Sequence, residues 1–260
     1  MYHMNISKHI KYAFTLAEVL ITLGIIGVVA ALTLPSLTAK YQSMIFKQQY
    51  KKVYNTFSNA LLKTYANNGG SYYVCYYLEG AYSVCSERDP VTGACTSFSS
   101  TYGYDQNSQC DALFSELKTI LKVVKVCDTQ SYKNGCIPDM KGYDSVLVDN
   151  KGDGGSTSDP DIIGSTSGCG GFRETNIKNN NSSWVLADGT VVGFYSGIPG
   201  KIFWVDINGH KKPNKWGHDI FTFSIESDVA QKKVKIKPGG CMSPEKGGQS
   251  STDMFASLYN

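Results

Sequence analysis

One carboxylate, Glu18, stands inside an otherwise apolar run that extends from Phe14 to Leu34. At about 1.5 Å per helical residue, this run is long enough to cross the roughly 30 Å hydrocarbon core of a bilayer. A carboxylate at that depth costs on the order of 3 kcal/mol unless it finds a partner. The run contains no Lys or Arg, since the next base after Lys11 is Lys40. The partner of Glu18 must therefore come from the end of its own segment or from another molecule, and the second possibility indicates assembly.

The residues before the apolar run predict its orientation. They include Lys8 and Lys11 and no acidic residue, and positive charge favours a cytoplasmic N-terminus with the rest of the chain exported. An ordinary signal peptide has an apolar core of about 7–15 residues followed by a cleavage site of small residues. The one such site, at Val29–Ala31, lies inside the run, so cleavage there would remove most of the anchor. We therefore expect the apolar segment to be retained.

The sequence AFTLAEVL, which begins at Ala13, resembles the processing signal of type IV pilins and type II secretion pseudopilins. In that family a prepilin peptidase cuts before the Phe and methylates its new amine, which implies processing between Ala13 and Phe14. The family glutamate is the fifth mature residue, where Glu18 stands, and a common proline is the twenty-second, where Pro35 stands. The usual residue before the cut is Gly, and here it is Ala13. The resemblance covers residues 8–66 most strongly.

The resemblance implies a single-pass protein of the bacterial inner membrane, with an extracytoplasmic C-terminal part that later enters a periplasmic or cell-surface filament. Its partners would be the prepilin peptidase, other pilin or pseudopilin subunits and the inner-membrane assembly platform. The Phe14 amine of one subunit would approach the Glu18 carboxylate of a neighbour, and in low dielectric an uncompensated charge would penalise a misaligned subunit. The bulky, cysteine-rich C-terminal part favours a minor pilin or a pseudopilin.

The pattern along the chain predicts four segments. They are a leader over 1–13, a transmembrane and assembly helix over 14–36, an amphipathic continuation over 37–66, and an extracytoplasmic disulfide-rich head over 67–260. In the third segment apolar side chains recur every three or four residues, which is the period of an amphipathic helix. Pro35 predicts a kink or local melting, because proline removes a backbone hydrogen bond. Asn67–Gly70 predicts the end of the helix.

All eight cysteines lie beyond the apolar run, which suits an exported protein with up to four disulfides. They are Cys75, Cys85, Cys95, Cys110, Cys127, Cys136, Cys169 and Cys241. No Cys-x-x-Cys pair occurs, so structural zinc and thioredoxin-like redox sites lack their spacing. Many pairings are possible: Cys85–Cys95 and Cys127–Cys136 are local candidates, and Cys169–Cys241 would fix the C-terminal segment, as disulfides often do in pilins. The alternative is a reduced protein with buried thiols.

The whole pattern predicts an α+β fold in which the long N-terminal helix packs on a C-terminal antiparallel β-sheet head. A second helix is predicted over 111–126 from its apolar period. Residues 149–171 are rich in Gly, Asp and Ser and predict a loop. Asp188-Gly189 between two apolar runs predicts a β-hairpin. Two further strands are expected on either side of the polar connection 206–219.

Asp206, Asn208 and Asp219 offer the hard oxygen ligands that calcium takes. The loop that they flank resembles the C-terminal loop of many pseudopilins, some of which bind calcium there. Three lysines at positions 211–215 oppose a divalent cation in the same loop. The competing interpretation is structural, with Asp206 and Asn208 capping a turn and Asp219 starting the returning strand. The acidic stretch after Asp149 lacks the EF-hand pattern, and we expect no other cofactor.

No enzymatic motif stands out, and we expect no catalytic residue. Only His210 and His218 lie beyond the leader, and the segment Gly164–Gly168 has Thr166 where a nucleophile elbow needs serine. The formal net charge of +3 would fall to +1 on loss of the two leader lysines. This near-neutral charge argues against a general nucleic-acid partner.

Two alternative functions remain open. A DNA-uptake or adhesion pilin would use an exposed basic patch, of which the lysines at 211–215 form a small example. A solitary membrane-anchored extracytoplasmic domain would bind a ligand without polymerising. N-terminal processing and the effect of Glu18→Ala discriminate between these interpretations.

Overall fold

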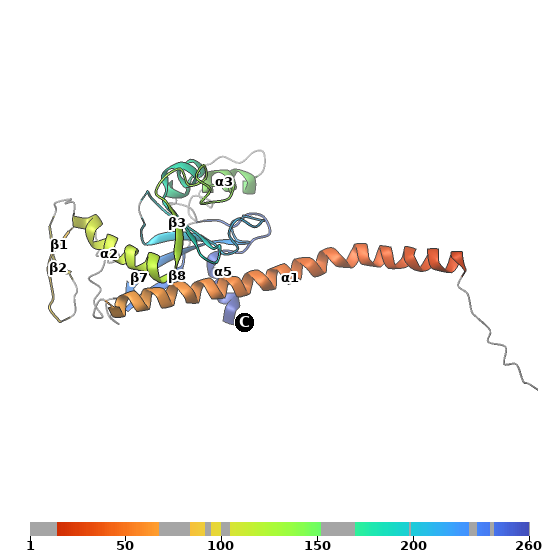
Figure 1. Cartoon of the computed structure of the whole chain (residues 1–260), viewed down its shortest axis with the longest axis horizontal. Helices are drawn as coiled ribbons and strands as arrows, with labels where there is room; N and C mark the ends of the chain where they lie inside the picture. The colour runs from red at the N-terminus through yellow and green to blue at the C-terminus, as the bar shows by residue number, and fades with distance from the viewer. Residues whose placement is uncertain are drawn as a thin grey trace, which may run out of the picture. The chain divides into compact units, whose positions relative to one another are not determined.

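The computed structural model describes residues 15–67, 84–91, 95–99, 105–151, 170–197, 199–228, 233–239 and 242–259. The expected processing residues Ala13 and Phe14 lie outside this part of the chain. The chain divides into two compact units, Met1–Met44 and Ile45–Asn260. Helix α1, Leu16–Asn67, begins in the first unit and ends in the second, which is called the head below (Figure 1).

The predicted long N-terminal helix is present as α1. It is the one helix of the described residues that is long and apolar enough to cross a membrane. In the first unit its large apolar side chains are exposed, as Leu20, Ile25 and Leu32 illustrate. A soluble domain would bury such side chains, so this half of the helix has the surface of a segment that needs an apolar environment.

The predicted local melting at Pro35 is wrong, because α1 is helical on both sides of this residue. Proline removes a single N–H from the hydrogen-bond ladder, and the helical residues around it keep their bonds. Thr38 Oγ1 also lies 3.0 Å from each of the carbonyl oxygens of Leu34 and Pro35 and donates to them. Asn67 ends the helix, which agrees with the predicted stop.

The head contains the predicted antiparallel sheet. Its six strands are β3 (Val123–Cys127), β4 (Ser183–Leu186), β5 (Val191–Phe194), β6 (Ile202–Asp206), β7 (Ile220–Asp228) and β8 (Lys233–Pro238). Each strand pairs with the next in chain order, so the sheet is a meander with β3 and β8 at its edges. A separate two-stranded sheet consists of β1 (Val84–Arg88) and β2 (Cys95–Ser99).

The predicted hairpin at Asp188-Gly189 joins β4 to β5. Gly189 has a φ of +87°, a conformation that glycine adopts without a Cβ clash. Gly193 in β5 has a different role, because a Cβ there would lie 2.1 Å from the ring of Trp204 on the neighbouring strand. The close packing of Trp204 on the sheet therefore depends on this glycine.

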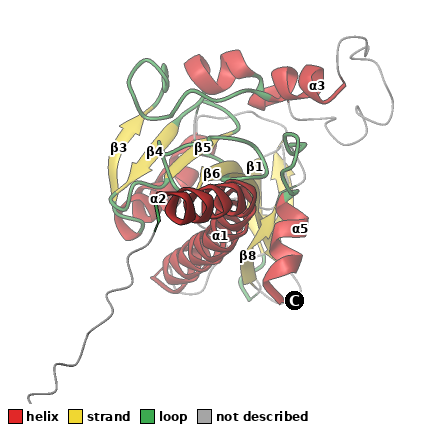
Figure 2. Ribbon diagram, turned by 90° about the vertical axis from the view of Figure 1, so that its right-hand side faces the viewer, coloured by secondary structure: helices red, strands yellow, loops and turns green. Residues whose placement is uncertain are grey.

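Both faces of the sheet are covered, because successive residues of a strand point to opposite faces. On one face Phe203, Val205 and Phe221 pack with Tyr50 and Phe57 of α1. On the opposite face a second core forms around the middle of the sheet. Its larger members are Trp204, Trp216, Ile220, Phe172, Ile177 and Ile137. Figure 2 shows β3, β4, β5 and β6 in that order across the sheet.

Three helical segments differ from the sequence prediction. Helix α2, Asp105–Ile120, starts earlier than expected and ends before the valine-rich stretch that forms β3. β-Branched residues favour a strand where a neighbouring strand is available, and β4 supplies it. Helix α3, Tyr143–Lys151, includes residues 149–151 of the predicted loop, and the 3-10 helix η3, Gly170–Phe172, includes 170–171. The rest of that loop lies outside the described residues.

Short elements complete the head. The π-helix η4 is Asn176–Asn180, helix α5 is Ser251–Ala256, and the 3-10 helix η5 is Ser257–Tyr259. Ser250 caps α5 by accepting a hydrogen bond from the Asp253 backbone N–H. Tyr50 of α1 is fully buried and donates to the Ser251 carbonyl at 3.0 Å, so α5 is fastened to the head half of α1.

The structure contains a disulfide between Cys127 and Cys136, one of the two local pairings considered above. It joins the end of β3 to the turn that follows. The backbone register sets Cys85 opposite Phe98 and Cys95 opposite Arg88. The remaining sulfur pairings lie outside the described side chains.

Candidate functional site

The first candidate site is the N-terminus of α1, where Thr15 and Glu18 form a capping box. The Thr15 backbone N–H and hydroxyl both donate to Glu18 Oε2, at 2.8 and 2.9 Å. The Glu18 N–H donates back to Thr15 Oγ1 at 3.2 Å. This reciprocal pattern satisfies donors that a helix N-terminus otherwise leaves free.

The capping box answers one question raised by the sequence. Glu18 does find partners at the end of its own segment, so hydrogen bonding alone does not require another molecule. These hydrogen bonds do not neutralise the negative charge of the carboxylate. Thr15 is uncharged, and no Lys or Arg lies between Glu18 and Lys40. A cation from outside the helix is therefore the partner that the capping box does not provide.

The second candidate site is the connection between β6 and β7, where Asp206, Asn208 and Asp219 come together. Asp206 and Asp219 are completely buried. Asp206 Oδ1 accepts from the Asn208 backbone N–H at 3.2 Å. Asp219 accepts from the backbone N–H groups of Asn214 and Lys215, at 2.8 and 2.7 Å. Hydrogen bonds to the two carboxylates therefore hold the backbone of the connection, which agrees with the structural interpretation.

Hydrogen bonding in this connection is incomplete. Asp206 Oδ2 and Asn208 Oδ1 are buried and have no hydrogen-bond partner among the described residues. Burial, and then the nearby Asp219 carboxylate, raise the pKa of Asp206 to about 9. Burial also raises the pKa of Asp219, although its backbone hydrogen bonds oppose this shift. Two buried carboxylates with two orphan oxygens form an acceptor-rich place, which a hard cation or a proton would stabilise.

The residues at this connection fit calcium in part. The orphan oxygens are of the type that calcium prefers, and the lysines at 211, 212 and 215 are exposed whereas the acids are buried. Solvent therefore screens the charge of these lysines. The carboxylates are only two, and the described residues contain no group of three or more His, Cys, Asp or Glu placed to hold a metal. Further ligands would have to be carbonyl oxygens or water.

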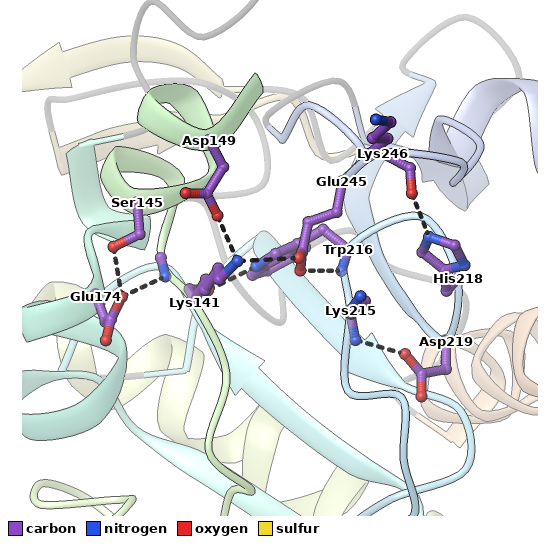
Figure 3. Close-up of polar contacts among 11 residues, drawn as sticks. Lys141, Ser145, Asp149, Glu174, Lys215, Trp216, His218, Asp219, Glu245 and Lys246 are labelled. Carbon is purple, nitrogen blue, oxygen red and sulfur yellow. Dashed lines mark hydrogen bonds and ion pairs between the residues drawn. The ribbon is translucent and has the colours of Figure 1, made fainter. Parts of the chain in front are cut away.

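A charged groove of about 720 Å³ lies on the head. Figure 3 shows polar contacts among several of the residues that line it. Four separate segments line it: α3 with the loop before it, η4 with the turn before it, the 213–215 turn, and Glu245. Lys141 pairs with both Asp149 and Glu245, the latter at 3.7 Å. Glu245 is largely buried, and its Oε1 accepts from the Trp216 backbone N–H at 3.2 Å.

A second ion-pair network lies in the same groove. Lys178 bridges Asp139 and Glu174, at 2.7 and 2.8 Å. The Ser145 hydroxyl donates to Glu174 at 2.6 Å. The Lys178 ammonium, and then Ser145, lower the pKa of Glu174, so this carboxylate remains ionised at neutral pH and is a weak base. The network fastens α3 to η4 and leaves no activated nucleophile at Ser145.

Sequence reasoning missed this groove. Its residues are spread over about a hundred positions, and none of them falls in a spacing that predicts a common site. The amphipathic period of α1 and the Asp-Gly turn are local signals, whereas Lys141, Glu174 and Glu245 meet only through the tertiary fold. The chain matches no family model, and neither the curated proteins nor the solved structures contain a significant match.

Proposed function

We propose that this chain is a subunit of a type IV pilus-like or type II secretion filament, anchored and assembled through α1. The observation that carries the proposal is the first unit, with exposed apolar side chains along its helix and one capped carboxylate, Glu18, near its start. The motif around Ala13–Glu18 and the proline at Pro35 support it. The alternative is a solitary membrane-anchored domain that binds a ligand and does not polymerise.

The mechanism that we propose is mechanical. Subunits stored in the membrane are extracted and packed by their N-terminal helices, which bury one another's apolar side chains. The methylated amine of Phe14 in an incoming subunit would meet the Glu18 carboxylate of a neighbour. Because Thr15 already orients this carboxylate, the pair would form with little loss of side-chain freedom.

Processing is the first test. The full chain is expressed with a prepilin peptidase, and the membrane-bound product is analysed by intact mass and N-terminal sequencing. We expect a chain that begins at N-methylated Phe14. A chain that keeps Met1, or one that is cut near Ala31, would contradict the proposal and favour the solitary anchored domain.

Glu18 variants separate capping from charge. Glu18→Gln keeps a side-chain carbonyl that can accept from Thr15 but removes the negative charge, and Glu18→Ala removes both. If the charge gives register, both variants should lower filament yield at least tenfold while the subunit still accumulates in the membrane. Filaments are quantified by electron microscopy and by shear fractionation. Normal filament formation by Glu18→Gln would show that only capping matters.

We also propose that the β6–β7 connection holds a calcium ion in the assembled protein. The orphan Asp206 Oδ2 and Asn208 Oδ1 support this proposal, with Asp219 as the third side chain. A bound divalent cation would remove the repulsion between the two buried carboxylates and stabilise the head. Thermal unfolding of the full chain in detergent should shift upward with millimolar calcium and not with magnesium. Asp219→Asn should abolish the shift, whereas an unchanged shift in that variant would place the ion elsewhere.

A further inference from the structure

The charged groove of the head has an excess of negative charge. Its three ammonium groups belong to Lys141, Lys178 and Lys215, and its five carboxylates to Asp139, Asp144, Asp149, Glu174 and Glu245. Five negative and three positive charges leave a formal charge of −2. Asp149 and Glu245 share Lys141, and Asp139 and Glu174 share Lys178. Each of these two ion-pair networks therefore keeps one negative charge uncompensated.

Glu245, in the turn at 242–249, is a buried acid with incomplete hydrogen bonding. It is 8% exposed, and its Oε1 accepts from the Trp216 backbone N–H at 3.2 Å. In the described part of the chain its Oε2 has one polar contact, with Lys141 Nζ at 3.7 Å, which is too long for a hydrogen bond. Lys141 is hydrogen-bonded to Asp149 instead (Figure 3). A buried carboxylate oxygen without a hydrogen bond is costly, and a donor that enters the groove would satisfy it.

The lining of the groove excludes several classes of ligand. An anion would meet an excess of negative charge. No three His, Cys, Asp or Glu residues of the described chain are placed to hold one metal ion. None of the described residues that line the groove is aromatic, so it offers no stacking surface for a nucleobase or a quaternary ammonium group. The ligand must therefore spread its positive charge along the groove and donate hydrogen bonds.

Hydrogen-bonding groups distinguish a free amine from a basic peptide. A peptide brings carbonyl oxygens that need donors, but Lys141 and Lys178 are engaged by carboxylates and the Ser145 hydroxyl donates to Glu174. Each ammonium group of a polyamine only donates, which suits a lining rich in carboxylates. Val148 lines the groove and is 57% exposed, and it offers apolar contact for methylene groups.

We propose that this groove binds a linear aliphatic polyamine. One ammonium group of the ligand donates to the network of Glu245 and Asp149, and another donates to the network of Asp139 and Glu174. The methylene groups between them contact apolar side chains of the lining. Lys215 is exposed and has no ion pair in the described part of the chain, so it repels the ligand and weakens binding. Binding of a polyamine does not depend on filament assembly.

The test measures binding of spermidine to the full chain in a neutral detergent at low salt, by isothermal titration calorimetry. Putrescine, with two ammonium groups, and n-butylamine, with one, are titrated in the same way. Spermidine should bind at least as tightly as putrescine. Butylamine should bind on the order of tenfold more weakly than putrescine, because it loses one charge-assisted contact. Added sodium chloride should weaken binding of all three amines.

Two single variants test the charges of the groove in opposite directions. Glu245→Gln keeps an acceptor for the Trp216 N–H and removes a negative charge, so the affinity for spermidine should fall on the order of tenfold. Lys215→Gln removes the repelling charge and should raise the affinity. Circular dichroism confirms that both variants remain folded.

A double variant at exposed positions avoids any change in a buried residue. Asp139→Asn/Asp149→Asn should lower the affinity for spermidine at least as much as Glu245→Gln, because the side chains of both acids are more than half exposed and both line the groove. Asp128→Asn/Glu226→Gln removes the same charge outside the groove and should leave the affinity unchanged.

Four results would overturn the proposal. The wild-type chain could fail to bind spermidine at millimolar concentration, or the control pair could lose as much affinity as Asp139→Asn/Asp149→Asn. Magnesium could displace spermidine at an equal concentration of charge, which would show unspecific attraction of cations. A blocked peptide with two lysines separated by two alanines could bind more tightly than spermidine, which would assign the groove to a basic segment of a protein partner. Weaker binding of this peptide than of putrescine would support the polyamine site.

Discussion

The two units of this chain differ in the burial of their apolar side chains and in the hydrogen bonding of their carboxylates. In the first unit Leu20 and Ile25 are about 60% exposed, while the one carboxylate, Glu18, is hydrogen-bonded by its own helix. In the head an extensive apolar core is buried, while Asp206 keeps an oxygen without a partner among the described residues. The first unit therefore lacks an apolar environment, and the head lacks an electrostatic partner at one place. Each unmet requirement indicates what the unit should bind.

The largest expected effect compares one apolar deletion in each unit. Phe57 of the head half of α1 is 8% exposed and stacks on Phe203, with ring centroids 5.3 Å apart. Phe57→Ala should lower the free energy of unfolding of the head by about 3–5 kcal/mol, because it leaves a cavity. Ile25→Ala, at a side chain 60% exposed, should change it by less than about 0.5 kcal/mol.

Denaturant unfolding in detergent measures both values. The three tryptophans, Trp184, Trp204 and Trp216, all lie buried in the head and report on it alone. A similar loss in the two variants would show that the first unit contributes to head stability, and the contrast between the units would fail. Membrane retention of Ile25→Ala serves as the control for its expression.

The next effect concerns the disulfide that closes the turn after β3. Cys127→Ser/Cys136→Ser should lower the free energy of unfolding by about 2–3 kcal/mol, as loop-closure entropy predicts for a short loop. The same Trp fluorescence assay measures it. Reducing agent should lower the stability of the wild-type chain at least as much, because it opens this bond together with any others. Full stability after reduction would mean that packing of the buried Cys136 fixes the turn without the bond.

A smaller effect is the pH dependence of the stability of the head, which the buried Asp206 carboxyl should cause. The folded-state pKa of Asp206 is raised to about 9, above an unfolded value of about 3.9. The folded state therefore binds the proton more tightly, and stability falls as pH rises between these values. The slope is at most about 1.4 kcal/mol per pH unit, or about 2 kcal/mol between pH 6 and 7.5.

Asp206→Asn is the matched variant for this prediction, because it keeps the shape and removes the titrating group. Its stability in EDTA should depend less on pH than that of the wild-type chain, as urea midpoints at several pH values would show. An unchanged pH dependence would mean that other groups govern it and that the folded-state pKa of Asp206 lies close to its unfolded value.

The sequence predicted the elements whose signals are local. The period of α1 and the Asp188-Gly189 turn each depend on residues close in the chain, and both are present in the structure. The valines of β3 were assigned to a helix, because β4, which pairs with them, lies some sixty residues away. Asp206 and Asp219 were grouped because their loop resembles the pseudopilin C-terminal loop and because both offer oxygen ligands. The contact between the 206–219 connection and the turn at 242–249 was missed, because its main-chain hydrogen bonds join residues that are distant in sequence.

The smallest expected effect asks whether charge or burial holds α1 against the head. Lys52 of α1 pairs with Asp188 of the β4–β5 turn at 2.7 Å, and their side chains are 64% and 44% exposed. An exposed pair of this kind contributes about 0.2–1 kcal/mol, since solvent screens it. A double-mutant cycle with Lys52→Ala and Asp188→Ala should give a coupling energy in that range and smaller at high salt. A coupling energy comparable to the loss in Phe57→Ala would mean that the helix is held by charge. A small value would assign the attachment to Tyr50, Val53 and Phe57, whose burial is the property that the exposed half of the same helix lacks.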